Sequence, residues 1–533
     1  MRIAICAVLF SNDQLIGSQR PRALARILAE RGHEVTVFTP EVPADTYAPS
    51  PPGVTVVTLP LYSPRAQENI GALPLWQRLI IFASVAPTVP RAFILSHDKF
   101  AKIFGVSPAE SAAAFEELNK RRKLTAGRTR SLLDAHNWTA RAKRATAPRF
   151  GSRLTPTSEH SLSTNAPTFH TTSQYPLDKN PSQNTTSDSQ PRFDAIFATY
   201  GPFGSLWFGN VLADHNPHAV RIADMRDAMV IPSLIWTVKG FLAWEEHRTL
   251  KDASIVTVIS KGVRTAILEQ KWNRQYADKI HVLPNGFLRR EKSPRPNSSD
   301  EAAQKEASNS FLHRQKSLHS AAEDSPGPLR IVYTGQMYRG ERDPSPLFRT
   351  LRVIKDENPR AEVEVHYAGN QGYVMEAAAA EYGLAEIVTD HGVLPHEEAL
   401  ALQEQADLLL VLSWNRRANQ GIISGKFGEY LACEKPILAL ISGDLAGAEL
   451  SSLISAMNVG HSHEAVSGEA GDATLTEFLR DAVTRRNSGR PLRYEPVETE
   501  VNTFDYTTIT EKLEHLIHEA LGSGTVEKKA EKP

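Results

Sequence analysis

Cysteine is almost absent from this chain: Cys6 and Cys433 are the only two among 533 residues. Both lie in apolar stretches, which favours a reducing compartment and argues against a disulfide framework or a cysteine-ligated metal site. No apolar run reaches the roughly 18 residues of a membrane-spanning helix. A net charge of −1 excludes a protein that is basic throughout. We therefore expect a cytoplasmic protein.

The chain is too long for one domain, because 533 residues correspond to two or three. Apolar runs alternate with helical patterns in two successive series, separated by polar segments. This alternation predicts an α/β protein with two doubly wound domains that face each other across a cleft. The expected strands of the first series are Ile3–Leu9, Val35–Phe38, Ala195–Thr199, Ala219–Ala223, Ile255–Ile259 and Ile280–Leu283. Those of the second are Arg330–Thr334, Glu362–Ala368, Ile387–Thr389, Leu408–Leu412 and Ile437–Leu440.

Two polar segments, rich in residues such as Ser, Thr, Pro and Asn, cannot bury enough apolar surface to offset the entropy of ordering. We expect both to be disordered, one as an insertion in the first domain and one as the linker between domains. The predicted divisions are residues 1–288 with the insertion at 154–192, the linker at 289–328, a second domain at 329–500, a C-terminal helix at 501–521 and a disordered tail at 522–533.

The segment Gly421–Leu440 carries the clearest sign of chemistry. A glycine-punctuated turn leads into a short helix that carries Lys426 and Glu429, and an apolar strand follows. The free N–H groups at a helix start favour an anion, and Lys426 adds a full positive charge. Glu429 is placed to accept hydrogen bonds from hydroxyls, so the segment suits a sugar nucleotide. The alternative is an ordinary amphipathic helix with solvated charges.

A basic region lies in the first domain, where residues 120–153 hold eleven Lys or Arg and a single acid, Asp134. An apolar and aromatic stretch, Leu73–Phe104, precedes it. We expect this lobe, residues 73–153, to attach to an anionic membrane surface. A solvated helical lobe remains the alternative, and nucleic acid is disfavoured because no nucleic-acid-binding motif accompanies the charge.

Motifs spread over both domains together resemble one family. They are Arg20-Pro21, Arg31–Pro40, Ile222–Asp227, Ile255–Ser260, Leu283–Phe287, Tyr333–Pro344 and Gly425–Ala439. In this order they resemble GT-B glycosyltransferases of the large retaining family 4. The resemblance implies two Rossmann-like domains and transfer of a sugar from a nucleotide diphosphosugar to a polysaccharide or glycolipid precursor, with retention of configuration. It implies no metal and no cofactor.

The resemblance places the donor in the second domain, where basic residues after the first strand hold the diphosphate. The candidates there are Arg339 and Arg342, with Lys426 facing them. The family has two glutamates seven residues apart: Glu429 matches the second, and the first falls on a glycine. We therefore expect backbone N–H groups of Gly421, Ile422 and Ile423 to replace that carboxylate.

In the first domain, Asp224, Arg226 and Asp227 follow a strand at its carboxyl end and are expected to face the cleft. Gly17 and Arg20 lie at the first loop. We expect Gly17, Arg20, Asp224 and Arg226 to approach the acceptor, and Asp227 to act in catalysis together with Arg339 and Lys426. Asp227 has an alternative role as the N-cap of the following helix.

The expected partners are a nucleotide sugar, a sugar or lipid-linked acceptor and an anionic membrane, with the protein peripheral at the inner membrane face. Two other functions stay open at this point. Some sugar-nucleotide epimerases share the GT-B architecture, although no distinctive epimerase motif is visible. A non-catalytic protein that binds a nucleotide sugar is the other alternative, because a glycine replaces the first glutamate.

Overall fold

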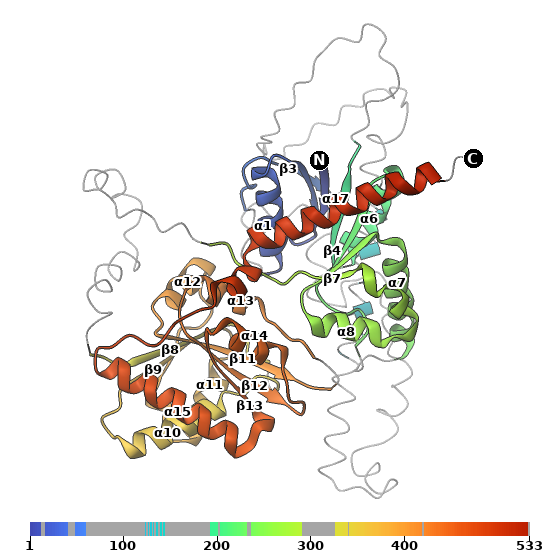
Figure 1. Cartoon of the computed structure of the whole chain (residues 1–533). Coiled ribbons are helices and arrows are strands. Elements are labelled where there is room, and N and C mark those ends of the chain that lie inside the picture. The colour runs from blue at the N-terminus through green and yellow to red at the C-terminus, as the bar shows by residue number, and fades with distance from the viewer. Residues whose placement is uncertain are drawn as a thin grey trace, which may run out of the picture.

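The computed structural model shows two α/β domains, each built on one parallel sheet (Figure 1). It describes residues 1–11, 16–40, 48–59, scattered positions between 123 and 143, and then 192–200, 203–231, 236–289, 326–338, 340–417 and 420–530. Most of the lobe predicted at 73–153 therefore lies outside the described residues. The same holds for the insertion at 154–192 apart from Arg192, and for the linker between 290 and 325.

The N-terminal sheet has seven parallel strands in the order β3-β2-β1-β4-β5-β6-β7. Most of these strands are buried on both faces, which is why they read as apolar runs in the sequence. β3 was missed because it is an edge strand whose Thr55 and Thr58 are exposed. The strands are β1 (Arg2–Cys6), β2 (Glu34–Pro40), β3 (Val54–Leu59), β4 (Ala195–Tyr200), β5 (Val220–Met225), β6 (Ile255–Val258) and β7 (Ile280–Val282).

Helices cover both faces of this sheet. In α1, the face that carries Leu24, Ile27 and Leu28 is buried against the sheet, as the spacing of these residues predicts. The helices are α1 (Ile16–Glu30), α6 (Gly204–His215), α7 (Trp236–Asp252), α8 (Lys261–Glu269) and the 3-10 helix η5 (Lys271–Lys279).

The C-terminal sheet has six parallel strands in the order β10-β9-β8-β11-β12-β13. The sequence did not predict β13, because this edge strand contains two histidines, a serine and a glutamate instead of an apolar run. The strands are β8 (Leu329–Thr334), β9 (Val363–Ala368), β10 (Val388–Asp390), β11 (Leu408–Asn415), β12 (Ile437–Gly443) and β13 (Gly460–Glu464). The helices are α10 (Ser345–Glu357), α11 (Gly372–Glu381), α12 (His396–Glu404), α13 (Gly425–Ala432), α14 (Glu449–Met457) and α15 (Gly468–Asn487).

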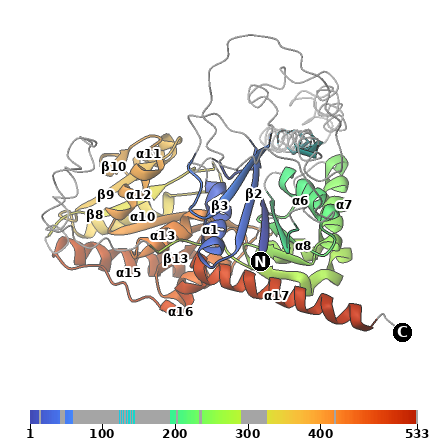
Figure 2. The same ribbon diagram turned by 90° about the horizontal axis from the view of Figure 1, so that it is seen from above.

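The end of the chain returns to the N-terminal domain through α16 (Glu498–Val501), the 3-10 helix η8 (Asn502–Phe504) and α17 (Tyr506–Ala530). Figure 2 shows α17 running along the N-terminal domain. Its Ile509, Leu513 and Ile517 are buried in the same core as residues of α1 and β1. The helix predicted at 501–521 thus exists, but it continues through most of the expected tail to Ala530. Lys and Glu in that tail are good helix formers.

The two crossings between the domains pair with each other. Phe287, which follows β7, donates its N–H to the Phe504 carbonyl at 2.9 Å. Its own carbonyl accepts the N–H of Tyr506, also at 2.9 Å. This pairing fixes where the chain passes from one domain to the other. Within the described ranges, every helix is too short or too polar to traverse a bilayer.

Candidate active site

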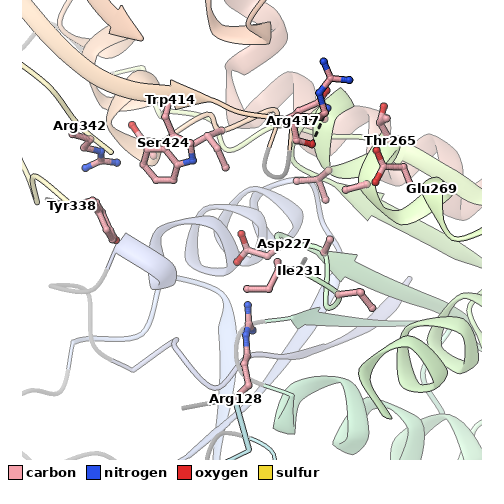
Figure 3. Close-up of a pocket in the computed structure, with 18 of the residues that line it drawn as sticks. Arg128, Asp227, Ile231, Thr265, Glu269, Tyr338, Arg342, Trp414, Arg417 and Ser424 are labelled. Atoms are coloured by element: carbon pink, nitrogen blue, oxygen red, sulfur yellow. Dashed lines mark hydrogen bonds between the residues drawn. The ribbon is translucent and has the colours of Figure 1, made fainter. Parts of the chain in front are cut away.

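A cavity of about 850 Å³ lies between the two domains, at the carboxyl ends of strands from both sheets. Ligands of open parallel sheets bind at this edge. The C-terminal domain lines the cavity with the loops after β8 and β11 and with the start of α13, and the N-terminal domain with the loop after β5 and with α8. Figure 3 shows Arg342, Tyr338 and Trp414 on one side of the cavity and Arg128 and Asp227 on the other.

Lys426 lines the cavity as the second residue of α13. Its Nζ lies 2.9 Å from Oε2 of Glu429, one turn further along the helix, and the two side chains are mostly buried. Gln403 of α12 also donates to this Oε2, at 3.2 Å. Glu429 stands behind Lys426 and is not part of the cavity lining. The carboxylate thus orients the ammonium group, whose remaining N–H bonds are available to an anion.

Arg342 lies in the loop between β8 and α10, and lines the same cavity. Its Nη1 donates to the Tyr333 hydroxyl at 3.0 Å and to the Gln336 carbonyl. Its guanidinium lies 4.6 Å from the ring centre of Tyr338 and 5.7 Å from that of Trp414. The Nε is buried and has no hydrogen-bond partner. One edge of the guanidinium is therefore held in place while a buried donor stays unused.

The end of β8 connects these two cations. Gly335 has φ +135°, and a Cβ on it would lie 3.7 Å from Cε of Lys426 and 3.8 Å from the Tyr333 hydroxyl. The backbone of Gly335, which has no side chain, thus lies between Lys426 and the pair formed by Tyr333 and Arg342. The structure brings Arg342 and Lys426 into one cavity, as the sequence predicts. Arg339, the third cation of that prediction, lies outside the described residues.

Gly421 touches the N-terminal domain at Gly262. Its φ is +68°, and a Cβ on it would lie 2.4 Å from Cα of Gly262 at the start of α8. No side chain fits there, so this position has no room for the family's first glutamate while the domains keep this arrangement. Of the three residues expected to offer backbone N–H groups, only Ile422 lines the cavity, and Ile423 is buried.

A second contact joins the domains beside the first one. Glu449, at the start of α14, accepts hydrogen bonds from the backbone N–H groups of Lys261 at 2.8 Å and Gly262 at 2.9 Å. Ser260 is the N-cap of α8, because its Oγ accepts the N–H of Val263 at 3.1 Å. The free backbone N–H groups in the first turn of α8 thus bind partly to Ser260 of their own domain and partly to the Glu449 carboxylate of the other domain. Sequence reasoning missed Glu449, whose only signal was an acid in the first turn of a helix.

Arg20 and Asp224 form a buried ion pair, with Nη2 and Oδ1 2.9 Å apart. Thr199 and Thr257 donate to the carboxylate at 2.9 and 2.7 Å, and Arg20 also donates to the Pro284 carbonyl at 2.6 Å. Burial alone would raise the pKa of Asp224, but the guanidinium and the hydroxyl donors hold it below its usual range. Neither side chain lines the cavity. We therefore expect this pair to stabilise the fold. The prediction that Arg20 and Asp224 contact an acceptor was wrong for this cavity.

Arg226 and Gly17 also lie behind the cavity and do not line it. Arg226 donates to the carbonyls of Tyr200 at 3.1 Å and Gly17 at 2.9 Å, and burial lowers the pKa of its guanidinium. A Cβ on Gly17 would lie 2.7 Å from Cδ1 of Leu9, so the start of α1 packs closely against the loop after β1. Both residues fasten α1 to the strand ends.

Asp227 is exposed and lines the cavity, as the sequence predicts for a residue that faces the cleft. The helix that follows, α7, begins only at Trp236, which is too far along the chain for Asp227 to be its N-cap. Arg128 approaches from the same side, and its Nη1 donates to the Tyr200 hydroxyl at 2.8 Å. These two charged side chains face the C-terminal domain across the cavity (Figure 3).

Glu246 of α7 supports the loop after β5 from below. Its carboxylate accepts the backbone N–H of Met229 at 2.9 Å and an amide N–H of Asn273 at 3.1 Å. Burial raises the pKa of Glu246 to about 7. Sequence reasoning missed this residue, because Met229 and Asn273 lie 17 and 27 positions away from it and no local pattern links the three.

Comparison with known proteins adds the following. No protein-family model matches the chain, and no curated protein matches its sequence. The N-terminal domain of trehalose-6-phosphate phosphatase from Candida albicans is similar in structure, with a TM-score of 0.50 and 12% identity over 97% of this chain and 96% of that one. The chain has the GT-B fold.

Two further solved structures match almost the whole chain. WaaG, a glycosyltransferase of lipopolysaccharide biosynthesis, is 13% identical over 97% of this chain and 99% of its own, with a TM-score of 0.43. The α,α-trehalose-6-phosphate synthase of Burkholderia multivorans is 11% identical over 98% and 99%, with a TM-score of 0.48. Identities this low show the fold alone, so the function has to be argued from the site.

Proposed function

We propose that this GT-B protein is a retaining glycosyltransferase of family 4, which moves a hexose from a nucleotide diphosphosugar to a polysaccharide or glycolipid precursor. One observation carries the proposal: Arg342 and Lys426, from two separate loops of the C-terminal domain, line one interdomain cavity. Each is held by its own domain before any ligand arrives. Such a pair of fixed cations suits a diphosphate.

The reaction breaks the bond between the anomeric carbon of the sugar and the diphosphate oxygen. Negative charge grows on the departing nucleoside diphosphate as this bond breaks. Cations that are already aimed at that charge stabilise the transition state more than the ground state. Arg342 and Lys426 are cations of this kind, because contacts within their own domain already hold them in place. The acceptor hydroxyl forms the new bond, and its proton passes to the leaving phosphate.

The remaining residues divide between the two substrates. Glu429, which does not line the cavity, binds Gln403 and Lys426 through Oε2 and so orients Lys426 for the donor, in place of the ribose contact that the sequence predicted. On the opposite wall, Asp227 orients acceptor hydroxyls beside Arg128. Ala228, Val230 and Ile231 give that wall an apolar surface. This mixture suits an acceptor with both polar and apolar parts, such as a lipid-linked sugar.

A thermal-shift panel of sugar nucleotides, nucleoside diphosphates and nucleosides tests the proposal. A ligand that binds only the folded state raises stability by RT ln(1 + [L]/Kd). We expect nucleoside diphosphates and their sugars to stabilise the protein and nucleosides to have little effect. No stabilisation by any diphosphate would contradict the proposal.

Product analysis then separates this function from others. We expect slow donor hydrolysis without an acceptor, and the activity should persist in a chelator because side chains supply the positive charge. Conversion of the donor to an isomeric sugar nucleotide would indicate an epimerase. Binding without any turnover, tested over a range of acceptors, would indicate a non-catalytic binding protein.

A further inference from the structure

The exposed tryptophans of the described chain gather in one part of the N-terminal domain. Trp236 and Trp244 of α7 are 73% and 56% exposed, and Trp272 of η5 is 51% exposed. The other tryptophans that the structure describes, Trp207 and Trp414, are partly buried. Large apolar side chains exposed together mark an interaction surface more often than singly exposed ones do.

The two elements that carry these tryptophans run side by side in the same direction. Asn273 of η5 donates to Glu246 of α7 at 3.1 Å, and Lys279 at the end of η5 donates to the carbonyl of Ala253, just past α7, at 2.9 Å. Trp272 thus stands at the level of the middle of α7. Phe241, which is 40% exposed, lies 5.8 Å from Trp244 between ring centres.

Basic side chains outnumber exposed acidic ones on α7 and η5. Both glutamates of α7, Glu245 and Glu246, are buried, and Glu245 is occupied by Arg248 and by the indole N–H of Trp207. Arg248 also lies 5.5 Å from the ring centre of Trp244. The basic side chains of α7 and η5 are Lys239, Arg248, Lys251, Lys271, Arg274 and Lys279, against the exposed acids Asp252 and Asp278.

This surface borders the interdomain cavity. Lys239 of α7 lines the cavity, and so does Gln270, which directly precedes η5. Both views show α7 on the side of the N-terminal domain that faces away from the C-terminal domain (Figures 1 and 2). A flat object placed against α7 and η5 would therefore contact the N-terminal domain and leave the donor loops of the C-terminal domain free.

We propose that Trp236, Phe241, Trp244 and Trp272, here called the aromatic face, dock on the interface of an anionic lipid bilayer. Tryptophan favours this interface because its ring is apolar while its N–H needs a polar partner. Basic side chains beside the rings are attracted to anionic headgroups. Docking keeps the N-terminal domain, which carries the acceptor wall, at the bilayer that supplies a lipid-linked acceptor. That last step rests on the proposed function, whereas docking itself does not.

Vesicle co-sedimentation tests the proposal with the full chain. The probes are vesicles of phosphatidylcholine alone and of phosphatidylcholine mixed with phosphatidylglycerol. The test variant is Trp236→Ser with Trp244→Ser and Trp272→Ser. The matched control is Tyr373→Ser with Val393→Ser, which removes side chains of the C-terminal domain that are 55% and 75% exposed.

We expect the unmodified protein to bind the anionic vesicles, with weaker binding in high salt and little binding to phosphatidylcholine alone. The tryptophan variant should lose on the order of tenfold or more in its partition constant, and the control variant should lose none. All three proteins should unfold at similar temperatures, because the replaced side chains are exposed. Brominated lipids should quench tryptophan fluorescence in the unmodified protein and less in the tryptophan variant.

Equal vesicle binding by the tryptophan variant would overturn the proposal, since docking would then rest on another surface, such as the basic segment at 120–153. Absence of vesicle binding by the unmodified protein would overturn it too, as would binding to nucleic acid in place of vesicles. Binding of nucleoside diphosphates, measured on the same preparations, reports separately on the proposed function. A protein that docks but binds no diphosphate would support the aromatic face and contradict the glycosyltransferase.

Discussion

Gly262→Ala is the substitution whose consequence the structure defines most sharply. A Cβ at this position would lie 2.3 Å from Cα and 2.5 Å from N of Gly421 in the other domain. Ordinary contact begins at 3.4 Å, so the two domains must move apart by about 1 Å locally. Both neighbouring atoms belong to backbone, and no side-chain rotation can relieve the clash. Alanine itself is well tolerated in the first turn of a helix.

This displacement would break a second contact. The hydrogen bonds from Lys261 and Gly262 to Glu449 are 2.8 and 2.9 Å long, and a further 1 Å takes both beyond hydrogen-bonding distance. Two hydrogen bonds to a charged group contribute about 3 kcal/mol together. The arrangement seen here would therefore lose about a hundredfold in population relative to an open one. A misplacement of about 1 Å at an active site also costs roughly a hundredfold in rate.

Steady-state kinetics with the donor identified in the ligand panel checks this expectation. We expect kcat to fall about a hundredfold while the affinity for nucleoside diphosphate changes little, because Arg342 and Lys426 both belong to the C-terminal domain. Gly240→Ala is the matched control, since a Cβ there meets nothing within 4 Å. A Gly262→Ala variant with normal kcat would refute the claim that catalysis requires the contact between Gly262 and Gly421.

Three further substitutions test other parts of the account. Asp224→Asn leaves the buried Arg20 without its counter-charge, so urea unfolding should show a loss of about 3–5 kcal/mol, and unchanged stability would mean that the pair is not structural. The pKa of Glu246, about 7 against an ordinary 4.5, means that the stability present below pH 4.5 is lost as pH rises to 7. This loss, about 3 kcal/mol, should be absent in Glu246→Gln, and identical pH profiles would contradict it. Trp414→Leu should weaken nucleoside diphosphate binding severalfold by removing one ring from Arg342, whereas Trp414→Phe should restore part of it. Equal affinities for Leu and Phe would show that the ring does not position the guanidinium.

Buried parallel strands were the most predictable part of the fold. β1, β4, β6 and β11 are apolar on both faces, so their sequences stand out as continuous runs. The edge strands β3 and β13 alternate or are polar, and a search for apolar runs passes over them. The return of α17 to the first domain was also hidden, because an amphipathic pattern does not say which domain the helix covers.

The candidate site divides in the same way. Lys426 could be found because a glycine turn, a helix start and a strand follow each other within one short motif. Arg20 and Asp224 lie far apart in the sequence, so neither segment alone predicts that the two form a buried ion pair. The sequence showed only that Gly421 replaces a family glutamate. In the structure, Gly421 allows close contact with Gly262 of the other domain. Contacts made only when two domains meet leave no local pattern.

The most direct test of the central claim compares a nucleoside diphosphate with its nucleoside by isothermal titration calorimetry, in the unmodified protein and in Arg342→Ala and Lys426→Ala. If the two side chains hold the diphosphate, each variant should weaken binding of the nucleoside diphosphate on the order of tenfold or more and leave binding of the nucleoside unchanged. Equal affinity of all three proteins for the nucleoside diphosphate would contradict the claim that this cavity is a donor site.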